Sequence, residues 1–387
     1  MAFFGLSKPR SLLGIDIGTS SIKVVELSRE GGRFKLENYG LFELESMEES
    51  VTTVGSMTGS RPAHLSDLDI AWGIKEVLKR SKISARDAVA SIPTFTTFAT
   101  IITMPYLSQK DMAQSIQFEA RKYVPLPLNE VVLDWSIINI APSGNNQQPT
   151  SNVQSPTFHN QQVGSGKLGA GSSVNGPPTV EVFLVAVPKV ETGRYQFIAQ
   201  NSGVNLRALE LENSALIRSL VGNDLSPTAI VNIGGRSTSI LIVDGGFERV
   251  SHNYEVGGFE VTKSISRSLN ISLKRAEELK RSFGIKDVDN NVIQQSMSSL
   301  LDMMAFETKK TMHNYEDSRN VKIGKVILVG GLANMPNFIN YFSQKLGSPV
   351  IAGNPLARVI TPPGLEKLHP EISASFPIAI GLAMREI

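Results

Sequence analysis

The alternation of apolar and polar positions predicts many short strands and helices in mixed order. A period of two predicts strands, and apolar residues three and four positions apart predict helices. Expected strands are 12–17, 21–28, 34–44, 88–92, 96–104, 131–139, 180–187, 206–211, 229–233, 237–243, 247–255 and 326–329. Expected helices are 67–80, 108–123, 190–201, 213–221, 258–268, 273–283, 292–315, 336–345 and 376–385. This order indicates an α/β protein.

One segment breaks the pattern. In residues 141–179, 30 of 39 are Gly, Pro, Ser, Thr, Asn or Gln. Such a segment buries too little apolar surface to offset the entropy lost on ordering. We therefore expect a disordered loop. Strand patterns precede and follow it, so the loop is interpreted as an insertion between paired strands.

Two regions 216 positions apart repeat one pattern. Residues 13–21 and 229–237 each contain an apolar strand, one carboxylate or amide, a glycine turn with hydroxyl residues, and a return strand. This strand–turn–strand repeat predicts two similar lobes.

The repeated turn is a candidate anion site. Its backbone N–H groups and hydroxyls converge on one point, which suits a phosphate. Asp16 ends the first strand and could hold a hydrated Mg²⁺ beside that phosphate, while Lys23 could reach it as a point charge. A single turn of this kind is often only a turn. Two copies strengthen the interpretation.

Two further patterns extend the candidate site. Gly330 and Gly331 follow an apolar strand, where glycine lets a ligand approach the backbone, although a tight turn is the alternative. Pro336 is expected to open the next helix. Glu277 and Lys280 share one face of a helix, where a solvated ion pair is the alternative.

Composition excludes several other classes of protein. The 387 residues contain no cysteine, which excludes disulfides and thiolate chemistry. With 38 Lys and Arg against 36 Asp and Glu, the formal charge is +2 and indicates no nucleic-acid partner. The five histidines lack metal-ligand spacing, and 164–168 lacks the first glycine and the hydroxyl of a P-loop.

No stretch is long and apolar enough to span a bilayer or act as a signal peptide. We interpret the apolar residues Phe3, Phe4 and Leu6 as a frayed terminus or as a segment that packs onto the core. A weak anchor to a membrane or a partner is the alternative. We expect a cytoplasmic protein.

Together these motifs resemble the actin-like ATPase superfamily and, within it, the PilM family of type IV pilus assembly proteins. Residues 14–23 resemble its phosphate-1 motif, 231–238 phosphate-2, and 327–336 the adenosine motif. Residues 210–218 and 377–385 look like its two connecting helices. Residues 88–127 fall where the PilM and FtsA families carry an extra subdomain and look especially like PilM.

The resemblance implies an actin-like fold of two ribonuclease H-like lobes with that subdomain. Lobe I would comprise 1–84, 205–225 and the return 357–387. The extra subdomain, of the type named 1C, would be 85–204, and lobe II 226–356.

The resemblance also implies ATP and Mg²⁺ in the cleft between the lobes. Asp16 would hold the metal, and Glu212 would lie near the attacking water as the catalytic residue. The nucleotide would contact Gly18, Thr19, Ser20, Ser21, Lys23, Asn232, Gly234, Gly235, Ser237, Thr238, Gly257, Gly258, Lys263, Glu277, Lys280, Gly330, Gly331, Leu332 and Met335.

One residue departs from the family pattern. Asn232 stands where the family usually has Asp, which removes a charge from the metal region. We therefore expect nucleotide binding with slow or no hydrolysis.

The resemblance implies a cytoplasmic adaptor for the N-terminal peptide of the inner-membrane protein PilN. A groove from 88–105 and the helix 109–123 would bind the peptide. The membrane and PilO would be reached through PilN. Contacts with motor ATPases or the platform protein, and a homo-oligomeric ring, are left open.

Two alternatives carry different functions. An FtsA-like filament protein usually ends in an amphipathic membrane helix after a linker, whereas this sequence ends directly after the second connecting-helix motif. A small-molecule kinase needs a carboxylate base and a substrate domain, and no such motif follows the first hairpin. Polymer sedimentation and a kinase screen would separate these alternatives.

Overall fold

The computed structural model describes residues 11–44, 66–141, 178–285 and 292–386. They form two compact units, a larger one within Met1–Ser91 and Phe197–Arg385 and a smaller one within Ile92–Gln196. Expectations for the first ten residues and for almost all of the polar segment 141–179 lie outside the described residues.

The first sheet of the larger unit comprises β1 (Leu12–Ile17), β2 (Ser21–Glu30), β3 (Arg33–Glu43), β4 (Asp87–Ile92), β8 (Asn205–Leu211) and β14 (Val359–Ile360). Their order is β14-β3-β2-β1-β4-β8. Strand β1 pairs antiparallel with β2 and parallel with β4. The strand β4 therefore belongs to this sheet, although the predicted boundary placed it in the extra subdomain.

The second sheet comprises β9 (Thr228–Ile233), β10 (Thr238–Asp244), β11 (Phe247–Tyr254), β12 (Lys325–Gly330) and β13 (Val350–Ala352). Their order is β11-β10-β9-β12-β13. Strand β9 pairs antiparallel with β10 and parallel with β12, as β1 does with β2 and β4. The sequence repeat is thus a repeat of sheet topology, and the two sheets define lobe I and lobe II.

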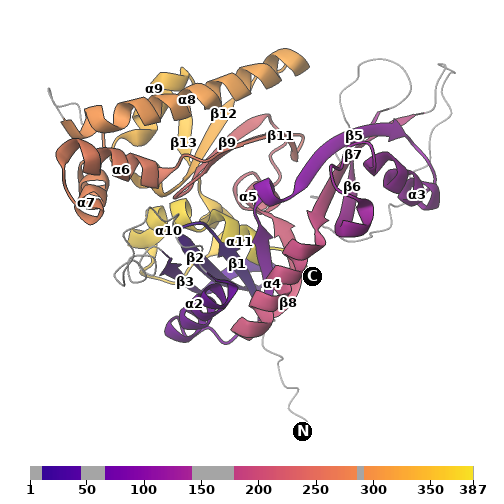
Figure 1. Cartoon of the computed structure of the whole chain (residues 1–387), viewed down its shortest axis with the longest axis horizontal. Coiled ribbons are helices and arrows are strands. Elements are labelled where there is room, and N and C mark those ends of the chain that lie inside the picture. Colours follow the sequence, from indigo (N-terminus) through magenta and orange to yellow (C-terminus); the bar gives the residue numbers. More distant parts are fainter. Residues whose placement is uncertain (1–10, 45–65, 142–177, 286–291, 387) are drawn as a thin grey trace, which may run out of the picture. The chain divides into compact units, whose positions relative to one another are not determined.

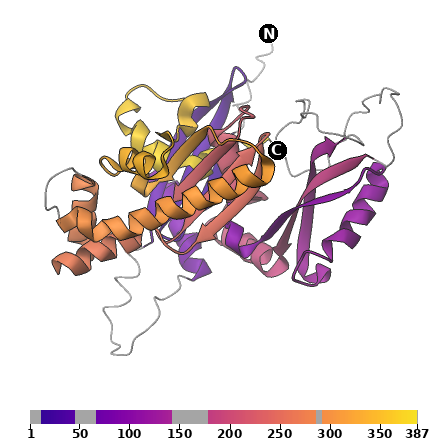
Figure 2. The same ribbon diagram turned by 90° about the horizontal axis from the view of Figure 1, so that it is seen from above.

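Helices cover these sheets (Figures 1 and 2). The helices of the larger unit are α2 (Asp67–Arg80), α5 (Glu212–Leu220), α6 (Gly258–Leu269), α7 (Leu273–Phe283), α8 (Val292–Arg319), α9 (Phe338–Leu346), α10 (His369–Ser375) and α11 (Pro377–Ala383). Helix α2 begins at a capping box, because the Ser66 hydroxyl accepts from the Asp69 N–H and the Asp69 carboxylate accepts from the Ser66 N–H. Buried residues of α8 such as Met297 and Met304 belong to the core of lobe II, as the sequence pattern indicates.

The helices α5 and α11 tie the two lobes together. A core cluster joins Leu216 of α5 and Leu382 of α11 to Val89 of lobe I and Ile230 of lobe II. Gly381 makes the helix contact possible, since a Cβ added there would lie 2.0 Å from the Ala215 carbonyl oxygen. These are the two helices expected to connect the lobes.

The smaller unit is a three-stranded antiparallel sheet with a helix (Figure 1). It contains β5 (Phe98–Pro105), α3 (Gln109–Ala120), β6 (Val131–Ala141) and β7 (Thr179–Pro188), and α4 (Lys189–Ser202) leads from it into the larger unit. Ser108 caps α3, and β6 pairs with β7 as expected for the strands that bound the polar segment. Met112 and Ile116 of α3 pack with Val182 and Leu184 of the sheet.

The expected elements differ from the structure mainly near the C-terminus. Pro336 does not open a helix, because Asn337 takes a left-handed conformation and α9 begins at Phe338. The expected helix 376–385 is found as α11, but the sequence pattern did not predict the separate helix α10 that precedes it. The strands β13 and β14 are too short to show an alternation of apolar and polar residues, so the sequence did not predict them. Among the described residues, no helix combines the length and apolarity needed to cross a membrane.

Candidate functional site

The first hairpin holds a buried carboxylate beside a lysine. Asp16 and Lys23 are cross-strand partners of β1 and β2, and Lys23 Nζ lies 3.3 Å from Asp16 Oδ2. The Ser91 hydroxyl, at the end of β4, donates to Asp16 Oδ1 at 3.1 Å. Asp16 is 4% exposed. The sheet therefore presents Asp16 in a fixed orientation at the base of the turn.

The tips of the two hairpins face each other. The Gly18 N–H donates to the Ser21 carbonyl at 3.0 Å, and Gly234 bonds Ser237 in the same way at 2.9 Å. A Cβ added to Gly235 would lie 2.4 Å from Ser20 Oγ, so this position accepts only glycine without a shift. The structure thus brings both predicted phosphate turns to one place.

Not every hydroxyl of the hairpins lies at the tips. Thr19 is exposed and Ser20 half-buried, whereas Ser21 is buried at the start of β2. Thr238 is fully buried, and its hydroxyl donates to the Val256 carbonyl at 2.7 Å. Thr238 therefore supports the segment leading to α6 rather than pointing its hydroxyl into the space between the tips.

Glu212 begins α5 and interacts electrostatically with Asp16 and Lys23 of the first hairpin. Burial and, second to it, the Asp16 carboxylate raise the pKa of Glu212 to about 8, against a lowering by Lys23. Two carboxylates and one ammonium therefore share this region.

Among the described residues, no group of three or more His, Cys, Asp or Glu side chains could hold a metal ion. One or two carboxylates do suit a Mg²⁺ that keeps its waters and arrives with a phosphate. Asp16 fits that role, because the Ser91 hydroxyl fixes the orientation of its carboxylate. Asn232, at the matching position of the second hairpin, adds no charge.

The second hairpin is bonded to the start of α6. Gly234 and Gly235 accept through their carbonyls from the N–H groups of Gly258 and Phe259, at 2.9 and 2.8 Å. A Cβ on Gly257 would lie 2.6 Å from both carbonyl oxygens. This close packing is the reason for the glycine pair before the helix.

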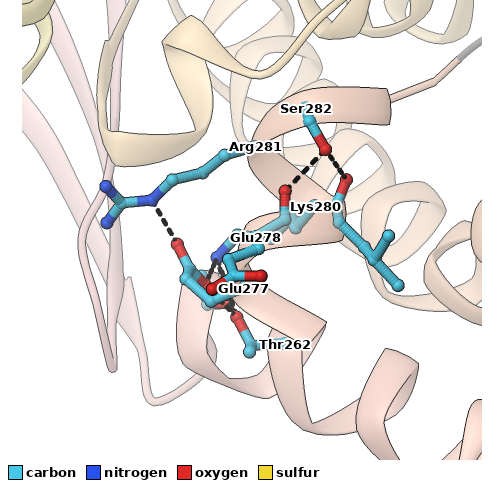
Figure 3. Close-up of polar contacts among 8 residues, drawn as sticks. Thr262, Glu277, Glu278, Lys280, Arg281 and Ser282 are labelled. Atoms are coloured by element: carbon cyan, nitrogen blue, oxygen red, sulfur yellow. Dashed lines mark hydrogen bonds and ion pairs between the residues drawn. The ribbon is translucent and has the colours of Figure 1, made fainter. Parts of the chain in front are cut away.

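A polar cluster joins α6 to α7 (Figure 3). Lys280 is 6% exposed and donates to the Gly258 carbonyl at 3.0 Å and the Thr262 hydroxyl at 2.8 Å. Its ammonium lies 2.6 Å from Glu277, which also accepts from Arg281 at 2.8 Å. Although burial raises the pKa of Glu277, Lys280 and its other donors hold that pKa below its ordinary value. Glu277 is therefore anionic, and the predicted pair is a network rather than a solvated ion pair.

The third glycine pair lies beside the same cluster. Gly330 has φ +92°, and a Cβ there would meet the Ile233 carbonyl oxygen at 2.0 Å. At Gly331 no atom lies within 4 Å of an added Cβ. Leu332 and Met335 are buried in the core of lobe II, with Leu332 Cδ2 3.8 Å from a Cβ on Gly258.

Lys263 of α6 has partners of its own. It forms an ion pair with Glu260, and its ammonium lies 5.0 Å from the centre of the Phe259 ring.

The sequence reasoning missed Ser91, Thr262 and Arg281. The spacing of four residues from Glu277 to Arg281 was a usable signal, whereas the contacts of Ser91 and Thr262 depend on tertiary structure.

We expect Lys280→Met to lower the thermal unfolding midpoint by several degrees. The variant removes the donor that the Gly258 carbonyl and Glu277 share, which corresponds to about 2–3 kcal/mol. Lys274→Met, at an exposed position of the same helix, should leave the midpoint unchanged. Equal midpoints for the two variants would contradict the assignment.

Glu248 of β11 is half-buried and has a buried carboxylate oxygen. Its Oε2 has no hydrogen-bond partner among the described residues. Burial raises the pKa of Glu248 to about 7, against a lowering by a hydrogen bond from Asn213. The folded state therefore binds this proton more tightly than the unfolded chain, so its contribution to stability is complete below pH 4.5 and is lost as the pH rises through 7.

Glu248→Gln should accordingly stabilise the protein at pH 8.5 by about 1–3 kcal/mol. The difference from the wild type should shrink as the pH falls toward 4.5. Urea unfolding at pH 5 and pH 8.5 measures both, with the exposed Glu255→Gln as control. A difference that stays constant with pH would refute this expectation.

Two lobes of equal topology, two connecting helices and a pair of opposed glycine hairpins define an actin-like ATPase fold. The family model described as type IV pilus assembly protein PilM matches residues 14–152 and 170–387. The chain belongs to this family.

Two solved structures show the same fold. A chain of a PilM–PilN type IV pilus biogenesis complex is 21% identical, with a TM-score of 0.72 and coverage of 97% of this chain and 98% of that chain. The ethanolamine utilization protein EutJ from Carboxydothermus hydrogenoformans is 16% identical, with a TM-score of 0.52 and coverage of 98% and 90%.

Proposed function

We propose that this chain is an ATP-binding adaptor of type IV pilus assembly that holds the N-terminal peptide of PilN. The proposal of nucleotide binding rests on one observation: the tips of the two hairpins lie close together, and the first hairpin carries Asp16 and Lys23. Membership of the PilM family supports a role in type IV pilus assembly, and the similar structure is that of a PilM–PilN complex.

The nucleotide would lie with its phosphates between the tips, against Gly18, Ser20 and Gly235. The adenosine would extend along Gly258 and Glu277 toward Gly331, where the backbone opens onto space. The anionic Glu277 would accept hydrogen bonds from ribose hydroxyls. Lys280 would keep Glu277 and the start of α6 in position.

Mg²⁺, when bound, would neutralise part of the phosphate charge. Asp16 would hold its water shell, and Glu212 would orient a water molecule near the terminal phosphate. Asp16 supplies a carboxylate at the base of the first hairpin, whereas Asn232 at the base of the second is neutral, so we expect slow or no turnover. Phosphate release by the wild type should not exceed that of Glu212→Ala, and release at the rate of a working ATPase would sink this part of the proposal.

The smaller unit would bind the peptide along β5 and α3. Strand β5 is an edge strand of its sheet, so its main-chain groups can pair with an added strand. Exposed aromatic side chains flank it, Phe95 before the strand and Phe118 on α3. Through PilN the adaptor would reach PilO and the inner membrane while remaining cytoplasmic itself.

Titration of the full chain with a synthetic PilN N-terminal peptide, with and without Mg-ATP, tests both halves and their coupling. Ile101→Glu on β5 and Phe118→Ala on α3 should each weaken peptide binding at least about tenfold. Val132→Glu, at an exposed position on the opposite edge strand β6, is the matched control. Peptide binding that survives both test variants would reject this placement.

A further inference from the structure

The turn that joins α6 to α7 carries a concentration of positive charge. Residues 264–276 contain the three cations Arg267, Lys274 and Arg275 and no carboxylate. Because the formal charge of the whole chain is +2, this short segment is more positive than the chain as a whole. The start of α8, where the Ser296 carbonyl accepts from the Ser264 hydroxyl, adds no carboxylate, since residues 292–301 contain no charged residue.

Hydrogen bonds within the turn fix its shape. Asn270 ends α6 in a left-handed conformation, with φ +51°. The Ser266 hydroxyl donates to the Ile271 carbonyl at 2.6 Å, and the Ser272 hydroxyl caps α7 by accepting from the Arg275 N–H. The last turn of α6 and the first turn of α7 are therefore held at the same end of the helix pair, together with their cations.

Much of this charge is not neutralised by the protein. Arg267 and Lys274 are exposed, and neither has an ion-pair partner among the described residues. Arg275 pairs with Glu278, but the two side chains are 61% and 51% exposed, so this pair contributes little. The cations at the turn thus differ from the buried Lys280 further along α7, whose charge Glu277 balances.

Apolar residues lie among these cations. Leu273 is 38% exposed at the first position of α7, and Ile271 beside it is half-buried. Exposed cations next to an exposed leucine suit an anionic lipid surface, because the cations attract the headgroup phosphates and the leucine enters the boundary of the acyl chains. Peptides usually bind along a sheet edge or in a groove. This turn is instead the end of a helix pair, which favours a broad surface as its partner.

We propose that the turn formed by residues 267–275, the basic turn, binds the anionic surface of a phospholipid membrane. Arg267, Lys274 and Arg275 contact headgroup phosphates, and Leu273 lies at the edge of the hydrocarbon. This contact goes beyond the proposed function, in which PilN links the chain to the membrane, and it needs neither nucleotide nor peptide. With three cations and one leucine it is weak, reversible and sensitive to salt, and it strengthens a link through PilN by avidity.

Co-sedimentation of the full chain with lipid vesicles tests the inference. Vesicles of phosphatidylcholine with phosphatidylglycerol, at about three parts to one, should bind the chain, and vesicles of phosphatidylcholine alone should not. Raising the salt concentration to about 0.5 M should release the bound chain, because exposed charges are then screened.

Substitutions locate the contact on the basic turn. Arg267→Glu with Lys274→Glu should raise the lipid concentration needed for half-maximal binding at least about tenfold, and Leu273→Ala should raise it about threefold. Lys309→Glu with Lys367→Glu, at two exposed positions elsewhere, changes the net charge equally and should bind vesicles as the wild type does. If thermal unfolding shows that the charge-reversed variant does not fold, Arg267→Gln with Lys274→Gln decides.

The remaining outcomes overturn the inference. They are a wild-type chain that ignores the anionic vesicles, one that binds both kinds of vesicle equally, and equal weakening by the test pair and the control pair. A wild type that binds polyglutamate but not vesicles would assign the basic turn to an acidic protein segment. Because the assay contains no nucleotide and no PilN peptide, these failures leave the proposed function intact.

Discussion

Gly14→Ala is expected to destabilise the larger unit by about 3 kcal/mol or more. A Cβ at this position would lie 1.9 Å from the Ala379 carbonyl oxygen and 2.7 Å from the Ala383 nitrogen. Both are backbone atoms of α11, which packs directly on β1, so no side chain can move aside. The helix must shift, and with it the core that joins the two lobes.

The thermal unfolding midpoint measures this effect. Gly324→Ala is the matched control, because no atom lies within 4 Å of a Cβ added there. Gly381→Ala should resemble Gly14→Ala, since its Cβ would meet the Ala215 carbonyl oxygen at 2.0 Å. If Gly14→Ala and Gly324→Ala unfold together, the close packing of α11 on β1 is wrong.

Glu210→Leu is expected to cost about 3–5 kcal/mol. Glu210 is 2% exposed and accepts from both terminal nitrogens of Arg218, while Arg385 Nη1 lies 3.4 Å away. Removing the carboxylate takes this anion away from the half-buried Arg218 and from the buried Arg385. Arg218 also donates to the Gly381 carbonyl at 2.7 Å, so the loss would spread to the contact of α5 with α11.

Arg207→Ala on the same strand is the control. Its side chain is 44% exposed and pairs with Asp87 at the surface, a type of ion pair that contributes about 0–1 kcal/mol. The double variant Glu210→Leu with Arg218→Met should recover part of the loss, because one buried charge disappears with its partner. Similar unfolding midpoints for Glu210→Leu and Arg207→Ala would show that the buried network does not stabilise the fold.

Strong periodicity made most elements predictable. The strand Leu12–Ile17 and the helix Asp67–Arg80 begin and end where the pattern places them. The repeat around Asp16 and Asn232 predicted two similar lobes, and the strand order β3-β2-β1-β4-β8 of one sheet corresponds to β11-β10-β9-β12-β13 of the other. Such elements are predictable because a buried face imposes a period on the residues that form it.

The C-terminal region was harder to predict. Strands β13 and β14 have three and two residues, too few to show a period, and form only because β12 and β3 offer free edges. Asn337 enters a left-handed conformation that delays α9 beyond Pro336. Tertiary contacts outweigh local preference in such short segments.

The sequence indicated which residues belong to the candidate site, but not how deeply each of them is buried. Residue types and spacing indicated the glycine turns, Asp16, and the pair of Glu277 and Lys280. Burial of Thr238, Leu332 and Met335 could not be read from those motifs.

The sequence by itself determined the class of fold, since periodicity and repeated glycine turns are local properties of the chain. Only the tertiary structure decided which polar groups meet. Asp16 is held by Ser91 from 75 residues away, and Lys280 by Gly258 from 22 residues away. Such contacts depend on how strands and helices pack, because side chains that meet across elements leave no period in the sequence.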